Sequence, residues 1–158
     1  MKEKNLAKAI LKRLFEGSRI EGIRFGPILQ LLVTDRDSQE TPIYGQIYLN
    51  LVSSWMIIDS LPLSPPNSED DFPAYSEDEQ IQLLCSLKNL EIVKIELGNK
   101  HPHLIFTFEN GKIFTLNGID YAYECWQAGV AFNKKESCQI IACPGGELAI
   151  WDARTFQY

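Results

Sequence analysis

One segment of the sequence, residues 59–75, limits the folds open to this chain because it resists both helix and strand. It contains Pro62, Pro65, Pro66 and Pro73, which are four of the eight prolines in the chain. Proline lacks the backbone N–H that a helix interior or a central strand donates. The other residues are mainly polar, acidic or small. We therefore expect an exposed, extended connection here, with the regular structure on either side of it.

A helix is predicted before each of the two regions that this connection separates. Within residues 4–16, apolar side chains recur at spacings of four and seven, and Gly17 follows as a stop signal. The polar face of this helix is basic, which is compatible with a membrane surface but is more typical of a helix that covers a sheet. The second helix is expected at 77–88, because Ser76 and Glu79 form a capping box.

Alternating apolar and polar residues predict strands in both regions. They are expected at 19–25, 28–33, 43–52 and 55–58 in the first region, and at 91–97, 103–109 and 112–116 in the second. The dipeptide Asn110-Gly111 indicates a hairpin with a type I′ turn, in which both residues have positive φ. A last hairpin is predicted at 138–151, where Pro144-Gly145-Gly146 forms the turn.

The two regions have similar patterns, which suggests an internal duplication. The pattern IxxIxFG begins at Ile20, and IxxIxLG begins at Ile92. Each region also ends near a tryptophan, Trp55 in the first and Trp126 in the second. The alternative is that two ordinary meanders look alike without a common origin.

These elements predict the fold class. A three-stranded meander cannot bury its apolar face alone, whereas two packed together can share a core. We therefore predict a single domain over residues 1–158 of the α+β class, made of two similar helix–β-meander units packed together with mainly antiparallel sheet. The units are 4–58 and 76–128, joined by the Pro-rich and acidic linker 59–75 and followed by the hairpin 138–151.

The acidic excess of the chain is confined to one stretch. The net charge is −6, from 21 acidic and 15 basic residues. Residues 59–79 hold seven acids and no Lys or Arg, which leaves 14 acids against 15 bases elsewhere. This balance disfavours nucleic-acid binding by a broad basic surface. With no secretory signal and no apolar run near the ~20 residues of a membrane helix, we predict a cytoplasmic protein that binds no membrane.

The sequence contains no recognisable catalytic, metal-binding or phosphate-binding motif. The cysteines, Cys85, Cys125, Cys138 and Cys143, are expected to be reduced and mostly buried, with a Cys138–Cys143 disulfide as the alternative. We therefore predict no cofactor, no metal and no enzymatic activity. The alternative is a ligand- or metal-dependent enzyme or sensor with a pocket near His101 and His103, where two imidazoles on one side of a strand could begin a zinc site.

The second half of the chain resembles the small immunity proteins that accompany secreted bacterial toxins. The residues that carry the resemblance are FENGKI at 108–113, YECWQ at 123–127 and PGGELAIW at 144–151. The resemblance implies a non-enzymatic protein that neutralises a toxin by forming a tight complex, and it supplies no catalytic residues. An acidic patch would steer a basic toxin domain to this protein.

Two groups of residues are predicted to contact the protein partner. The first combines acids with neighbouring aromatic residues, and the second is an aromatic cluster of the kind that anchors interfaces. They are Glu69, Asp70, Asp71, Phe72, Tyr75, Glu77 and Asp78, and Tyr121, Tyr123 and Trp126. The alternatives are that the first group is acidic only to stay solvated and that the second belongs to the core. The sequence does not predict the oligomeric state.

Overall fold

The computed structural model describes residues 2–36, 42–61, 64–131 and 137–151 of the chain. Within these ranges the α-helices are α1 (Lys2–Phe15) and α2 (Glu77–Cys85), and the short 3-10 helices are η1 (Glu69–Asp71) and η2 (Pro144–Gly146). The strands are β1 (Arg19–Arg24), β2 (Leu29–Thr34), β3 (Gln46–Leu51), β4 (Trp55–Ile58), β5 (Ile92–Leu97), β6 (Leu104–Phe108), β7 (Ile113–Leu116), β8 (Trp126–Ala131), β9 (Gln139–Cys143) and β10 (Glu147–Trp151).

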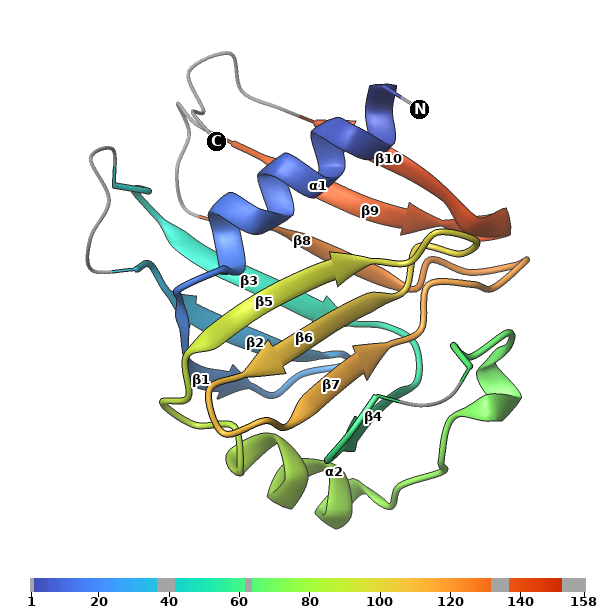
Figure 1. The fold of residues 1–158 in the computed structure, drawn as a ribbon, viewed down its shortest axis with the longest axis horizontal. Coiled ribbons are helices and arrows are strands. Elements are labelled where there is room, and N and C mark those ends of the chain that lie inside the picture. The colour runs from blue at the N-terminus through green and yellow to red at the C-terminus, as the bar shows by residue number, and fades with distance from the viewer. Residues whose placement is uncertain (1, 37–41, 62–63, 132–136, 152–158) are drawn as a thin grey trace.

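The strands form two antiparallel sheets (Figure 1). The larger sheet has the order β1-β2-β3-β8-β9-β10, and the smaller has the order β4-β7-β6-β5. The predicted meanders are β1-β2-β3 in the larger sheet and β5-β6-β7 in the smaller one, and the larger sheet also contains β8-β9-β10 in chain order. The α+β class with mainly antiparallel sheet is therefore confirmed.

Each meander is completed by a strand from the other half of the chain, which the sequence did not predict. The fourth strand, β4, leaves the first meander and pairs with β7, so that Trp55 lies opposite Leu116. In the same way β8 leaves the second meander and pairs with β3, so that Trp126 lies opposite Leu51. The predicted units 4–58 and 76–128 are therefore interlocked through exchanged strands.

The two halves also meet where each helix region leads into its first strand. Gly17 and Asn89 both have positive φ, at 82° and 62°. The Gly17 N–H donates to the Ile92 carbonyl at 2.8 Å, and the Asn89 N–H donates to the Ile20 carbonyl at 3.0 Å. Both first strands are irregular just after these isoleucines. The halves thus share an order of elements and several contacts, while their origin by duplication stays a prediction.

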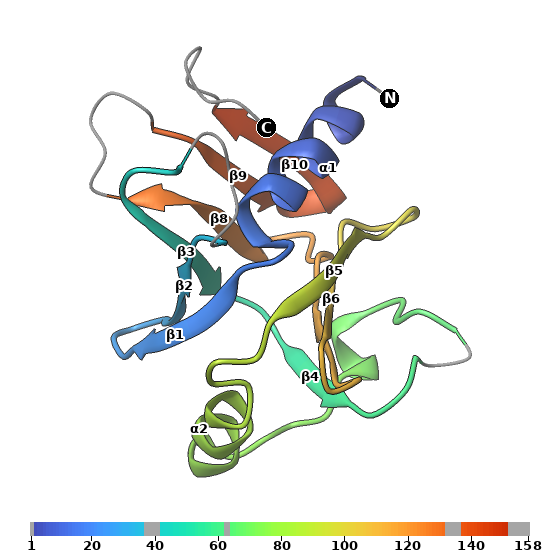
Figure 2. The same ribbon diagram turned by 60° about the vertical axis from the view of Figure 1, so that its left-hand side comes forward.

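Helix α1 packs with its apolar face inward, between the β10 end of the larger sheet and β5 of the smaller one (Figure 2). Its buried apolar residues are Ala7, Ile10, Leu11, Leu14 and Phe15. The Phe15 ring meets Phe106 edge-on at 5.3 Å between centroids. On its basic face Lys12 is exposed and Lys4 and Lys8 are half-buried, whereas Arg13 is buried and pairs with the Asp35 carboxylate at 2.8 Å. Neither α-helix in the described ranges has the length and apolar character needed to cross a bilayer.

Two local predictions differ from the structure. The hairpin between β6 and β7 is confirmed, but its turn is not type I′, because Asn110 does not have positive φ whereas Gly111 does, at 84°. The loop has three residues, with Gly111 in the left-handed position that such loops require. Its first residue, Glu109, is held by backbone and side-chain hydrogen bonds to Glu91. The second helix ends at Cys85, before the predicted residue 88.

Candidate partner-binding surface

The acidic segment, defined here as residues 69–79, comprises η1, a stretch without helix or strand and the start of α2, and η1 is the only regular structure in the described part of the predicted linker 59–75. Its acids Glu69, Asp70, Asp71, Glu77, Asp78 and Glu79 are all exposed. The Asp71 carboxylate accepts the backbone N–H groups of Asn67 and Ser68 at 2.7 and 3.2 Å, which closes η1. The Ser76 hydroxyl accepts the Glu79 N–H at 3.2 Å and caps α2. These turns fix the acids on the surface, and the three at the start of α2 lie at the positive end of its dipole.

Two of the predicted partner-binding residues, Phe72 and Trp126, are buried. Phe72 is 7% exposed, and its ring lies 6.2 Å from that of His103. Trp126 is fully buried, and its indole Nε1–H donates to the Pro102 carbonyl at 2.8 Å. Neither side chain can anchor a partner in this fold. The signal that was missed is the alternation of Trp126, Ala128 and Val130, which marks the inward face of β8.

The tyrosine loop, defined here as residues 117–125, presents the other two predicted aromatics to solvent. Tyr121 is 84% exposed and Tyr123 is 73% exposed. The loop is shaped by Asp120, whose carboxylate accepts the backbone N–H groups of Ala122 and Tyr123 at 2.7 and 2.9 Å. Such a turn is typical of aspartate and holds the following residues outward. The two tyrosines are therefore exposed on an ordered loop.

The acidic segment and the tyrosine loop meet at one edge of the molecule. Both are bonded to the connection between β3 and β4: the Ser54 hydroxyl donates to the Glu69 carboxylate at 2.8 Å, and the Ser53 N–H donates to the Cys125 carbonyl at 2.9 Å. In Figure 1 the tyrosine loop and the first part of the acidic segment, around η1, lie on the right-hand side, and the segment then continues to the start of α2 at the bottom. The fold thus brings together two residue groups that are distant in the sequence.

A groove of about 360 Å³ lies beside the acidic segment, and its exposed surface is mainly polar. Tyr75 and Glu69 from the predicted set line it, together with Trp55, whose ring lies 5.3 Å from that of Tyr75. Ile28 lines the opposite wall and is partly exposed, and Phe25 on the preceding turn is well exposed. We call the acidic segment, the tyrosine loop and this groove together the partner edge.

No family model, curated protein or solved structure matches this chain. The partner edge, and the histidine region that the alternative prediction names, are the features of the chain that bear on its function.

The histidine region contains a cavity of about 310 Å³, which His103 lines. Both ring nitrogens of His103, however, are hydrogen-bonded to backbone groups of the chain. The buried His103 ring accepts the Gly118 N–H at Nδ1, at 2.9 Å, and its Nε2 lies 2.9 Å from the Pro66 carbonyl. Nε2 must therefore carry the proton and donate to Pro66. Both nitrogens are occupied, so this ring cannot bind a metal or accept a proton without breaking one of these bonds.

The remaining candidate groups for chemistry are dispersed. Within the described ranges, no three His, Cys, Asp or Glu side chains are placed to hold a metal ion. The four cysteines, all in the described ranges, form no disulfide: Cys125 and Cys138 are buried, Cys143 is half-buried and Cys85 is exposed. Burial raises the pKa of the Cys125 thiol to about 11, with the Asp120 and Glu69 carboxylates adding to the effect. This thiol is protonated at neutral pH, which disfavours a nucleophilic role.

His103 instead holds the partner edge together. Through its two nitrogens it joins the backbone at Pro66, which precedes the acidic segment, to Gly118 in the tyrosine loop. The carbonyl of Pro102, its neighbour in sequence, accepts the Trp126 indole. His103 and Trp126 are thus the buried supports beneath the exposed acids and tyrosines.

The role of His103 predicts a specific pH dependence of stability. Burial lowers the pKa of its imidazole below the ordinary value of 6.5; the Pro66 carbonyl opposes this shift and the His101 charge adds to it. Between the two values the unfolded chain binds a proton that the folded chain does not. The contribution of His103 to the free energy of unfolding is therefore largest above about pH 6.5. It should decrease as the pH drops below this value, by at most about 1.4 kcal/mol per pH unit.

Urea unfolding from about pH 7.5 to pH 5.5 tests this prediction against His103→Gln, which has no titrating group at this position. The variant should be less stable at every pH but should lose less stability on acidification than the parent chain. Because both proteins keep His101 and all carboxylates, the difference between the two curves reports position 103. Parallel curves would show that His103 does not titrate across the unfolding transition.

Proposed function

We propose that this chain is a non-enzymatic, cytoplasmic binding protein that neutralises a basic toxin by forming a tight complex, as immunity proteins do. The observation that carries the proposal is the partner edge, where exposed carboxylates, two exposed tyrosines and a groove beside the Glu69 carboxylate lie at one edge of the molecule. This combination is what a protein needs in order to attract a cationic partner and then hold it.

The carboxylates supply the long-range attraction. The exposed acids lie in a stretch that has no Lys or Arg from 59 to 79, so their field is not cancelled locally. Such a field raises the association rate of an oppositely charged protein about 10- to 1,000-fold at low salt, and salt screens it. It acts on the encounter more than on the lifetime of the complex.

The tyrosines and the groove supply the short-range contact. Tyr121 and Tyr123 offer large amphipathic side chains at a low cost in conformational entropy, which is why tyrosine is enriched among residues that dominate binding energy. The groove between Ile28 and Tyr75 can accept an apolar side chain next to the Glu69 carboxylate. A lysine- or arginine-rich surface with an apolar residue would complement this edge.

The steering part of the proposal is tested with a charge-neutral variant, Glu69→Gln, Asp70→Asn and Asp71→Asn. These changes keep an acceptor oxygen for Ser54 and for the turn at η1 while removing three charges. The partner to test is a basic protein encoded by a neighbouring gene, where one exists, and its association rate at about 20 mM NaCl should fall about tenfold. At about 300 mM NaCl the parent and the variant should associate at similar rates. Stopped-flow fluorescence measures both.

The matched control is Glu3→Gln, Glu21→Gln and Glu109→Gln, which removes three exposed charges elsewhere on the chain. It should change the association rate less than about twofold. Equal effects of the two triple variants would show that only net charge matters and that the partner edge is not the docking face. Failure of the parent chain to bind the neighbouring protein, or to protect cells that express it, would refute the toxin-neutralising function.

A further inference from the structure

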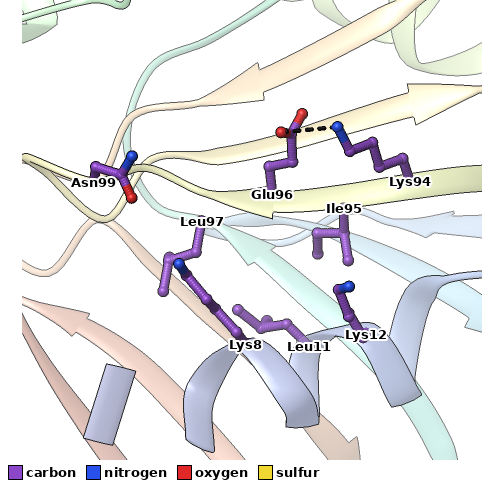
Figure 3. A pocket seen from close by; sticks show the side chains of 8 residues that line it. All are labelled: Lys8, Leu11, Lys12, Lys94, Ile95, Glu96, Leu97 and Asn99. Carbon is purple, nitrogen blue, oxygen red and sulfur yellow. Dashed lines mark ion pairs between the residues drawn. The ribbon is translucent and has the colours of Figure 1, made fainter. Parts of the chain in front are cut away.

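A second groove, of about 340 Å³, runs between α1 and β5 and differs in character from the partner edge. Figure 3 shows Lys8 and Lys12 rising from α1 toward the strand, and Leu97 and Ile95 pointing back toward the helix. With Leu11, these two side chains form a buried apolar floor. The groove therefore has an apolar base and a cationic wall.

The cations of this groove are only partly balanced by carboxylates, because the nearby Glu16 carboxylate accepts the Ile95 N–H at 3.3 Å and Glu96 lines the groove. Lys94 pairs with Glu96 at 3.0 Å, and Figure 3 shows this pair on the side of β5 that faces away from α1. Among the residues that the structure describes, no carboxylate lies within ion-pair distance of Lys8 or Lys12. A net positive charge therefore remains at the groove in a chain whose total charge is −6.

A third lysine extends the positive charge to one end of the groove. The Lys4 ammonium donates to the carbonyl of Asn99, a lining residue, at 2.6 Å. Lys4, Lys8 and Lys12 follow one another at intervals of four on the same face of α1, where like charges destabilise a helix. Burial lowers the pKa of Lys4, and the charge on Lys8 lowers it further. A bound anion would relieve this repulsion.

We propose that this groove binds a small molecule that carries a phosphate group and a short apolar body. The cations are lysines, whose ammonium groups bind phosphate as point charges, and a phosphate group with nearly two negative charges can face Lys8 and Lys12 together. The apolar floor accommodates the body of the ligand. The volume lies at the lower end of the range for small-molecule sites, so the ligand is a compact organic phosphate.

A phosphate on a lipid headgroup has the same chemistry as a phosphate on a soluble molecule, but the packing of α1 favours the soluble source. The apolar side chains that a surface-bound helix would insert into a bilayer are here buried against the two sheets. An interfacial helix needs such a face free. The lysines alone offer only charge to a membrane.

Phenyl phosphate is a suitable probe, because it joins a phosphate to a small apolar ring. Titrated to about 20 mM and followed by amide NMR, it should shift the signals of residues 8–12 and 95–99. The variant Lys8→Gln and Lys12→Gln should weaken its binding at least about tenfold, because two charge-assisted contacts are lost. Both positions are on the outer side of α1 and glutamine favours helix, so the variant should fold.

The matched control is Lys88→Gln and Lys112→Gln, which removes two cations near α2 and should leave phenyl phosphate binding unchanged. Inorganic phosphate should bind the same residues more weakly, and benzyl alcohol should not bind. The proposal is overturned if phenyl phosphate shifts no groove signals, or if both double variants weaken its binding equally. It is also overturned if the chain binds phosphatidylglycerol-containing vesicles but no soluble phosphate, since the occupant would then be a membrane. If the amide shifts of the groove residues change with protein concentration, the occupant would be a second copy of the chain, which likewise overturns the proposal.

Discussion

Replacing Trp126 by alanine should lower the free energy of unfolding by about 3–5 kcal/mol, the typical cost of deleting a large buried aromatic side chain. The indole is fully buried at the start of β8, the first of three strands that the second half of the chain contributes to the larger sheet and the one that pairs with β3. Its loss would leave a cavity and would free the Pro102 carbonyl from its hydrogen bond. Because a domain of this kind is stable by about 5–15 kcal/mol, much of the stability would disappear.

Urea unfolding followed by far-UV circular dichroism measures this effect without relying on the fluorophore that is removed. Trp151→Ala is the matched control, because Trp151 is 57% exposed and its loss should cost about 0.5 kcal/mol or less. Trp126→Phe keeps most of the apolar volume but leaves the Pro102 carbonyl unpaired, for an expected cost of about 1–3 kcal/mol. Similar costs for the two alanine variants would contradict the burial of Trp126.

The elements that could be predicted from the sequence are those whose signals are local. The apolar stripe of α1, the Ser76 cap of α2 and the Gly145-Gly146 turn between β9 and β10 each depend on a few neighbouring residues. Each of these elements forms where its pattern predicts. The predicted type I′ turn at Asn110-Gly111 was wrong although its signal is local. We attribute the difference to the hydrogen bonds between Glu109 and Glu91, 18 positions away, which make Glu109 the first residue of a longer loop.

The exchange of β4 and β8 between the sheets could not be predicted, because alternation tells which face of a strand is buried but not which strand is its neighbour. Strand β8 was missed entirely. Its Gly129 lowers the strand propensity of the segment although the alternation of Trp126, Ala128 and Val130 is intact, and glycine is needed there because a Cβ would lie 2.2 Å from the Cys138 carbonyl oxygen. The weak strand signal is thus a consequence of close packing with the adjacent strand.

The candidate surface also contains some features that could be predicted from the sequence and others that depend on tertiary contacts. The exposure of the acids could be predicted from their charge alone. In contrast, Tyr121 is exposed and Trp126 is buried, although both are large aromatic residues in one short stretch. The tyrosine lies in the turn set by Asp120, and the tryptophan begins a strand; composition does not separate them. The role of His103 depends on Pro66, 37 residues earlier, and Gly118, 15 residues later. The groove beside α1 likewise exists only through tertiary packing.

Gly118→Ala should be the second strongly destabilising substitution, costing about 3 kcal/mol or more. A Cβ at this position would lie 2.1 Å from the Pro102 oxygen, 2.2 Å from the Pro102 carbonyl carbon and 2.6 Å from the His103 nitrogen. These are backbone atoms, so no side-chain rotation relieves the overlap. Moving residue 118 away would break its hydrogen bond to His103, and moving Pro102 away would break the bond to Trp126.

Gly26→Ala is the matched control, because the nearest atom to the added Cβ, the Ile28 carbonyl oxygen, is 3.8 Å away and φ is not positive. Its effect on the urea midpoint should correspond to about 0.5 kcal/mol or less. In Gly118→Ala the tyrosine loop must also shift from its support, so the molecules that remain folded should bind the partner more weakly. A Gly118→Ala protein as stable as Gly26→Ala would mean that the loop can move away from Pro102 without loss. The tyrosines would then not be held in place by His103 and Trp126, and the partner edge would depend on the acidic segment and its groove alone.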